Sequence, residues 1–116
     1  MISPELMKKR YHADSYNCAH LVADAWRAET GEDIASLLRG FMRPKGQRSV
    51  EADKMRTFRK LDRPESPSIV VMRQGKNRLH VGMYLRGRIL QIRQDGVTFL
   101  PPHLATMGYT RVRYYA

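Results

Sequence analysis

The chain changes its apolar pattern at Pro64 and Pro67, and this change restricts the folds open to it. Before the prolines, apolar residues recur at the i, i+3, i+4, i+7, i+8 spacing that places them on one face of a helix. These residues are Cys18, Leu21, Val22, Ala25 and Trp26. After the prolines come short β-branched and aromatic runs separated by turn residues, a pattern typical of strands. Helices followed by strands predict an α+β domain, with N-terminal helices packed on a small antiparallel β-sheet.

Three helices are expected in the first half of the chain, over Asn17 to Thr30, Asp33 to Arg39 and Ser49 to Leu61. In the first, the side chain of Asn17 or Ser15 can accept hydrogen bonds from the unsatisfied N–H groups at the start. Gly31 follows the last residue as the expected stop, and Gly40 does the same for the second helix. Residues 42–48 are expected to form a loop.

Five strands are expected after the prolines. They are Ser68 to Met72, Leu79 to Leu85, Arg88 to Arg93, Val97 to Leu100 and Tyr109 to Tyr115, with a loop opening at Pro101. The second and third form a hairpin, and its expected pairs are Tyr84 with Ile89, Gly82 with Gln91 and His80 with Arg93. Because side chains alternate along strands, His80 and Gln91 then lie on one face, one diagonal step apart.

A chain of 116 residues is expected to form one domain, spanning residues 1–116. Its single cysteine excludes an internal disulfide framework. Residues 1–10 contain no apolar run of signal-peptide length, and no stretch approaches the ~20 apolar residues of a membrane span. We therefore expect no signal peptide and no membrane insertion.

The net charge of +10 is concentrated in the middle of the chain, where residues 39–78 hold twelve basic and four acidic side chains. Such a segment can attract nucleic acid, anionic lipid or an anionic cell envelope, and it can equally be a solvated surface. The basic residues that would contact phosphates are Lys54, Arg56, Arg59, Lys60 and Arg63. The sequence contains no recognised DNA- or RNA-binding motif.

Cys18 is a candidate nucleophile because it lies where the first helix begins. The unsatisfied N–H groups and the dipole of a helix start favour negative charge, so they favour the reactive thiolate. The same N–H groups can form an oxyanion hole. The alternative is that Cys18 is a small buried apolar residue, since it shares the helix face of Leu21 and Val22.

His80 is the candidate base that would pair with this thiol. A catalytic imidazole needs a third group to orient it, and the Gln91 amide can accept its N–H. Gly82, opposite Gln91, leaves the necessary space. The alternatives are that His80 is only a half-buried hairpin residue, and that His103 replaces Gln91 as the third group.

Two segments resemble the NlpC-type family of papain-like cysteine peptidases, and most closely its phage tail-assembly branch. Tyr16-Asn17-Cys18-Ala19-His20-Leu21-Val22 resembles the nucleophile helix, with Asn17 where Asp is usual. His80-Val81-Gly82-Met83-Tyr84 resembles the family's histidine strand, and Gln91 falls where the family places its third polar residue.

The resemblance implies a papain-like fold and cleavage of an amide in peptidoglycan stem peptides. Cys18 would be the nucleophile, His80 the base and Gln91 the orienting residue. Tyr16 and Asn17 would lie near the oxyanion and substrate-binding region, and no cofactor would be needed. A phage or prophage origin is implied, with phage tail proteins as partners and a location in the virion or the bacterial host cytoplasm.

Two other functions stay open. The chain can be a catalytically inactive structural or host-interaction protein on the same fold, because fold alone does not secure function. It can also be a small basic nucleic-acid-binding protein that uses residues 39–78. A metal site on His12, Cys18 and His20 is not expected, because their spacing and the lack of a fourth ligand do not fit zinc.

Overall fold

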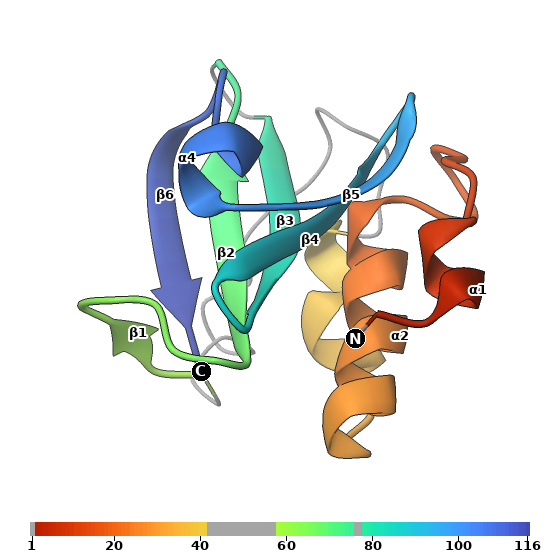
Figure 1. The fold of residues 1–116 in the computed structure, drawn as a ribbon, viewed down its shortest axis with the longest axis horizontal. Helices are drawn as coiled ribbons and strands as arrows, with labels where there is room; N and C mark the ends of the chain where they lie inside the picture. Colours follow the sequence, from red (N-terminus) through yellow and green to blue (C-terminus); the bar gives the residue numbers. More distant parts are fainter. Residues whose placement is uncertain (1, 42–57, 76–77) are drawn as a thin grey trace.

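An antiparallel sheet of six strands forms the centre of the fold, with helices on both of its faces (Figure 1). The computed structural model describes residues 2–41, 58–75 and 78–116. The strands are β1 (Lys60–Leu61), β2 (Ser68–Arg73), β3 (Leu79–Leu85), β4 (Arg88–Arg93), β5 (Gly96–Leu100) and β6 (Thr110–Tyr115), in the order β1-β6-β2-β3-β4-β5. The helical elements are α1 (Pro4–Met7), α2 (Cys18–Thr30), the 3₁₀ helix η1 (Ala35–Phe41) and α4 (Pro102–Ala105). The predicted α+β class is confirmed.

Helix α2 has the boundaries that its sequence predicts. The Asn17 side chain accepts the Ala19 N–H at 3.1 Å and caps the start. Gly31 ends the helix in the left-handed conformation, with φ at 80°, and its N–H donates to the Arg27 carbonyl. Glycine adopts this conformation without the steric cost that a side chain brings.

The buried face of α2 packs on β3 and β4. The residues of this core that come from these two strands are Leu79, Val81, Met83 and Leu85 of β3 and Leu90 and Ile92 of β4. A second cluster, of Val70, Met72, Ile89 and Ala105, fills the other face beneath α4. Each large apolar side chain buried here contributes roughly 1.5–3 kcal/mol to folding. Both faces of the central strands are therefore covered, and alternate residues of β3 enter different cores.

The predicted β3–β4 hairpin is confirmed, with Tyr84 opposite Ile89, but its regular pairing ends at Met83 and Leu90 and does not include the expected pairs Gly82–Gln91 and His80–Arg93. Its turn residues Arg86 and Gly87 both have positive φ, at 48° and 85°, as a two-residue hairpin turn requires. A Cβ added at Gly82 would lie 3.0 Å from the Leu90 carbonyl oxygen. Only glycine lets β3 and β4 approach this closely.

Two predicted helices differ in the structure, and the predicted loop over residues 42–48 lies outside the described residues. The second predicted helix is the short 3₁₀ helix η1, which continues past the expected stop at Gly40. The predicted helix over Ser49 to Leu61 falls mostly outside the described residues, and its end is wrong because Lys60–Leu61 forms β1 against the last residues of β6. Pairing with the distant chain end overrides the local helical pattern there.

Two short helices were absent from the prediction. The loop expected after Pro101 contains α4, where Pro102 occupies the first helical position and loses no hydrogen bond by lacking an N–H. Helix α1 is capped by the Ser3 side chain, which accepts the Leu6 N–H. None of the described helices is long and apolar enough to cross a bilayer.

Candidate active site

Cys18 is the first residue of α2, as the sequence predicts. Its side chain is 1% exposed and belongs to the core that α2 forms with the sheet. In that core lie Leu79 and Val81, the two β3 residues that flank His80. The thiol is therefore at a helix start and close to the sheet, and it is covered by protein.

The first turn of α2 is held by a reciprocal cap. While Asn17 accepts the Ala19 N–H, the His20 Nδ1 accepts the Asn17 backbone N–H at 3.0 Å. This is a capping box in which histidine replaces the usual Glu or Gln. The sequence contains the spacing of such a box, with an acceptor three positions after the capping residue. The structural role that this gives His20 was not predicted.

His80 and Gln91 form a buried hydrogen bond across β3 and β4. The distance from His80 Nε2 to Gln91 Oε1 is 2.7 Å, and the side chains are 4% and 1% exposed. Gln91 Nε2 donates to the Ala105 carbonyl of α4 at 2.9 Å, which turns the amide oxygen toward the imidazole. An amide oxygen only accepts, so Nε2 carries the proton. In the neutral imidazole, Nδ1 is then the basic nitrogen.

Tyr109 and Arg93 complete the surroundings of this pair. The Tyr109 ring is stacked on the His80 ring, with centroids 5.1 Å apart and an interplanar angle of 12°. The Arg93 guanidinium carbon lies 4.8 Å from the Tyr109 ring centre, and one of its terminal nitrogens donates to the Ala105 carbonyl at 3.1 Å. The expected hairpin pairing predicted that Arg93 lies on the same sheet face as His80. No feature of the sequence predicted that Tyr109 would stack on His80.

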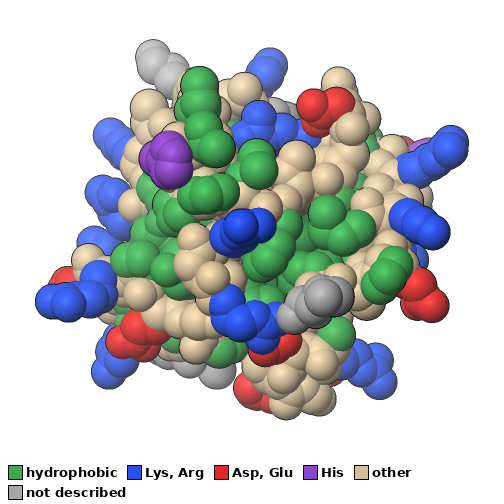
Figure 2. All heavy atoms as spheres, viewed as in Figure 1, with side chains coloured by type: hydrophobic (Ala, Val, Ile, Leu, Met, Phe, Trp, Pro, Cys, Tyr) green, Lys and Arg blue, Asp and Glu red, His purple; other side chains and the backbone are tan. Residues whose placement is uncertain are grey.

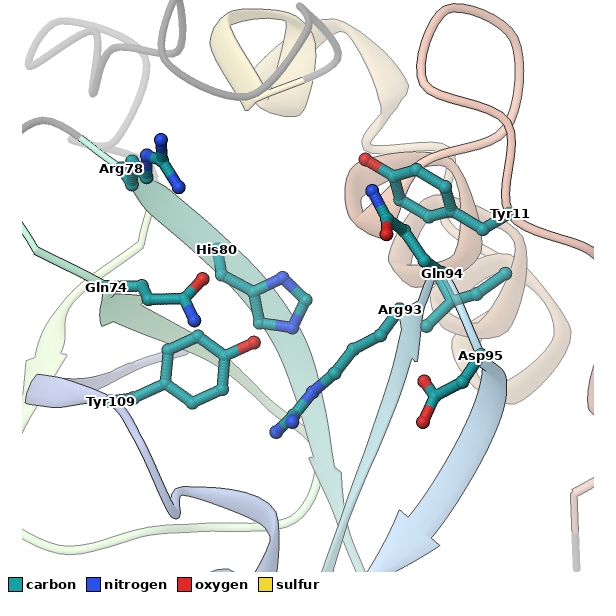
Figure 3. Close-up of a pocket in the computed structure, with 9 residues that line it drawn as sticks. Tyr11, Gln74, Arg78, His80, Arg93, Gln94, Asp95 and Tyr109 are labelled. Carbon is teal, nitrogen blue, oxygen red and sulfur yellow. The ribbon is translucent and has the colours of Figure 1, made fainter.

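His80 opens into a pocket of about 490 Å³ at the end of the sheet where β3 begins (Figure 3). The lining residues are Tyr11, Gln74, Arg78, His80, Ile92, Arg93, Gln94, Asp95 and Tyr109. They come from the segment before α2, from the ends of β2 and β4 and from the starts of β3 and β6. Cys18 does not line this pocket.

The pocket bends round the end of the sheet and so involves both of its faces. Tyr109 packs with the α4 side, and so does the ring of His80 that stacks on it. Ile92 and Tyr11 belong to the α2 side, as Cys18 does. Helix α2 and strand β3 both begin toward this end of the molecule (Figure 1). Cys18, the first residue of α2, and His80, the second residue of β3, therefore both lie toward this end of the sheet.

Tyr16 and Asn17 are engaged in structural contacts. The Tyr16 hydroxyl donates to Asp24 at 2.6 Å, and burial, together with the Asp24 carboxylate, raises the pKa of this phenol. Asn17 is fully buried, and its Nδ2 donates to the Ala13 carbonyl. With the phenol proton directed to Asp24, an oxyanion hole here would rely on backbone N–H groups.

The other histidines lie outside this arrangement. His103 is exposed on α4, and the residue bonded to His80 Nε2 is Gln91. His12 forms an isolated β-bridge with Tyr16. Over residues 2–41, 58–75 and 78–116, no group of three or more His, Cys, Asp or Glu side chains is arranged to hold a metal ion.

Much of the basic segment 39–78 lies outside the described residues, so its predicted binding of nucleic acid stays a prediction. Of the residues that are described, Arg59, Lys60 and Arg63 surround a hollow of about 350 Å³ together with Asp62 and Glu65. Figure 2 shows Lys and Arg side chains around the outline of one face and also in its middle, where they lie among hydrophobic side chains.

No protein-family model matches the chain, and no curated protein sequence matches it significantly.

Proposed function

We propose that this chain is a papain-like cysteine hydrolase of the NlpC type that cleaves amide bonds in peptidoglycan stem peptides. The observation that carries the proposal is the buried hydrogen bond from His80 to Gln91. It fixes the tautomer and orientation of an imidazole that also opens into a pocket. Burying a polar pair costs free energy unless it is fully hydrogen-bonded, so the hydrogen bonds of this pair hold both side chains in place.

In the proposed reaction, His80 Nδ1 takes the proton of the Cys18 thiol and the sulfur attacks the carbonyl carbon of the amide. The C–N bond breaks as His80 returns the proton to the leaving amine, which leaves a thioester on Cys18. Water, activated by the same nitrogen, then hydrolyses the thioester and restores the thiol. Gln91 holds the imidazole in place throughout and stabilises its protonated form.

The burial of the thiol favours the inactive alternative. Cys18 is 1% exposed and the pocket does not reach it. Buried cysteines in apolar surroundings are commonly inert. On this alternative, the fold serves structural or host-interaction purposes, and the pocket at His80 binds a partner without cleaving it.

The site of action follows from the proposed substrate. A hydrolase of stem peptides has to reach the cell wall, so we propose that the protein acts within a phage particle or in the infected or lysogenic host, with tail proteins as partners. These proposals depend on the hydrolase activity and are tested only after it.

Cleavage of isolated stem peptides tests the proposal. Wild type, Cys18→Ala, His80→Ala and the control Arg88→Gln are incubated with the peptides, and peptide masses and new amino groups are measured. We expect fragments from wild type and Arg88→Gln, a transient acyl mass on Cys18, and no fragments from the other two. Cleavage by Cys18→Ala at the wild-type rate would overturn the proposal.

Thiol alkylation at pH 6 separates the hydrolase from the inactive alternative. A helix-start thiolate in a working site reacts faster in the folded protein than in the denatured protein. Slower labelling of folded Cys18, together with no cleavage by wild type, would support the inactive alternative.

A further inference from the structure

Arg93 is a half-buried cation, and no acidic side chain among the described residues pairs with it. Among these residues, its buried Nε also has no hydrogen-bond acceptor. One terminal nitrogen donates to the Ala105 carbonyl, and the Tyr109 ring lies against the guanidinium. These contacts hold the group in place at the pocket wall, and no acidic side chain in the described part of the chain compensates its charge.

Such an arrangement is costly unless something else binds there. Withdrawing a guanidinium from water carries a penalty that a neutral carbonyl and an aromatic ring offset only in part. A carboxylate matches the planar donor array of Arg with two parallel hydrogen bonds. The pocket also places this donor array near the imidazole of His80, because both groups contact the Tyr109 ring.

We propose that the pocket is a subsite for a carboxylate of the substrate, with Arg93 as the residue that binds it. The inference rests on the proposed function, because it describes the substrate of the same site. A substrate whose carboxylate binds Arg93 would have its reacting amide directed toward the end of the sheet, where His80 lies.

Other charged residues of the pocket fit this assignment. Arg78 is exposed at the wall and adds a second positive charge, which attracts an anion to the opening. Asp95 also lines the pocket, and it forms no ion pair with Arg93. In Figure 3 the Arg93 side chain extends away from Asp95. The two arginines outnumber the one carboxylate, so an anion is favoured over a cation.

A matched pair of small probes tests the subsite by binding, without any need for turnover. The acidic probe is acetyl-Ala-Glu and the neutral probe is acetyl-Ala-Gln amide, and each is titrated into ¹⁵N-labelled protein while amide shifts are followed. The variants are Cys18→Ala, Arg93→Gln, Arg93→Lys and Arg88→Gln. Arg88 is the matched control because it also lies on β4 and over an aromatic ring, that of Phe99, but outside the pocket.

We expect the acidic probe to bind about tenfold or more tightly than the neutral probe to wild type, Cys18→Ala and Arg88→Gln. Arg93→Gln should remove this preference, and Arg93→Lys should retain only part of it, since a lysine keeps the charge without the planar donors. If Arg93→Gln fails to fold, Arg93→Lys decides the question.

Equal binding of the two probes, binding of neither, or an unchanged preference in the Arg93 variants would overturn the subsite. Failure of the hydrolase proposal looks different. An Arg93-dependent preference in a protein that cleaves no stem peptide would retain the subsite and reject the activity. Cleavage without any preference for the acidic probe would do the reverse.

Discussion

The ring of Tyr109 lies nearly parallel to the imidazole of His80, although the two residues are 29 positions apart in the sequence and a bulge is needed to bring them together. The bulge lies between β2 and β6, where Val71 pairs with Arg113 and Arg73 with Thr110. Strand β6 thus has one residue more than β2 over this stretch. Because side chains alternate, the extra residue turns Tyr109 to the α4 side of the sheet, where His80 has its ring.

Arg111 takes up the bulge with a φ of 49°, in the left-handed region that costs a side-chain-bearing residue about 1–2 kcal/mol. We therefore expect Arg111→Gly to keep or raise stability by up to about 1 kcal/mol, and Arg111→Val to lower it by about 1–2 kcal/mol. Urea denaturation measures both. If Val is tolerated as well as Gly, the bulge does not impose this conformation.

Gly82→Ala should destabilise the protein by about 1–3 kcal/mol, because the new methyl group would press on the Leu90 carbonyl oxygen at 3.0 Å and on the Ile89 side chain at 3.1 Å. Moving β4 away would also lengthen the hydrogen bond from His80 to Gln91. Thermal unfolding gives the first effect, and the imidazole ¹⁵N shifts of His80 report the second. Unchanged values for both would mean that the strands have room that the structure does not show.

Tyr16 should make stability depend on alkaline pH. Burial first, and then the Asp24 carboxylate, raise its pKa in the folded protein above the unfolded value of about 10. Its contribution to stability is therefore complete below about pH 10 and is lost as pH rises toward the folded pKa. Between pH 9 and 11, the urea midpoint of wild type should fall more steeply than that of Tyr16→Phe. Parallel curves would exclude this linkage.

The sequence predicted the parts of the fold that local patterns determine. The helical face from Cys18 to Trp26 and the hairpin turn at Arg86-Gly87 each depend on neighbouring residues, and both are present. The hairpin register then placed His80 and Gln91 on one face, and the structure joins them by a hydrogen bond. The alternation of side chains along two neighbouring strands was therefore enough to predict that His80 and Gln91 lie together.

What the sequence did not predict depends on contacts between distant segments. Strand β1 exists because residues 60 and 61 pair with the end of β6, and α4 matters because its Ala105 carbonyl orients the amide of Gln91. Every residue carries a backbone carbonyl, so no residue type in the sequence marks this acceptor. The alternation of side chains along the strand predicted that Arg93 shares a sheet face with His80. That no acidic side chain among the described residues pairs with Arg93 becomes apparent only in the folded structure.

Gln91 variants test the orienting role directly. Gln91→Ala should lower the hydrolysis rate about 10- to 100-fold, because the imidazole loses its hydrogen bond to the amide but remains present. His80→Ala should remove the base and lower the rate by up to about 10,000-fold. Each rate is divided by the fraction of protein that is folded, since loss of the buried amide also costs about 1–3 kcal/mol of stability. His103→Ala is the control.

Gln91→Glu makes the sharper variant, because it keeps the length of the side chain and replaces the donor that faces the Ala105 carbonyl with a second acceptor. Stability should fall by about 1–3 kcal/mol, since two acceptors then face each other inside the protein. The rate should hold or rise, because a carboxylate stabilises an imidazolium better than an amide does. Urea denaturation and peptide cleavage measure the two effects separately. Two results would show that Gln91 supports the fold and does not orient the base. The first is a hydrolysis rate of Gln91→Glu that falls together with its stability. The second is an unchanged rate in Gln91→Ala together with a lowered rate in His103→Ala.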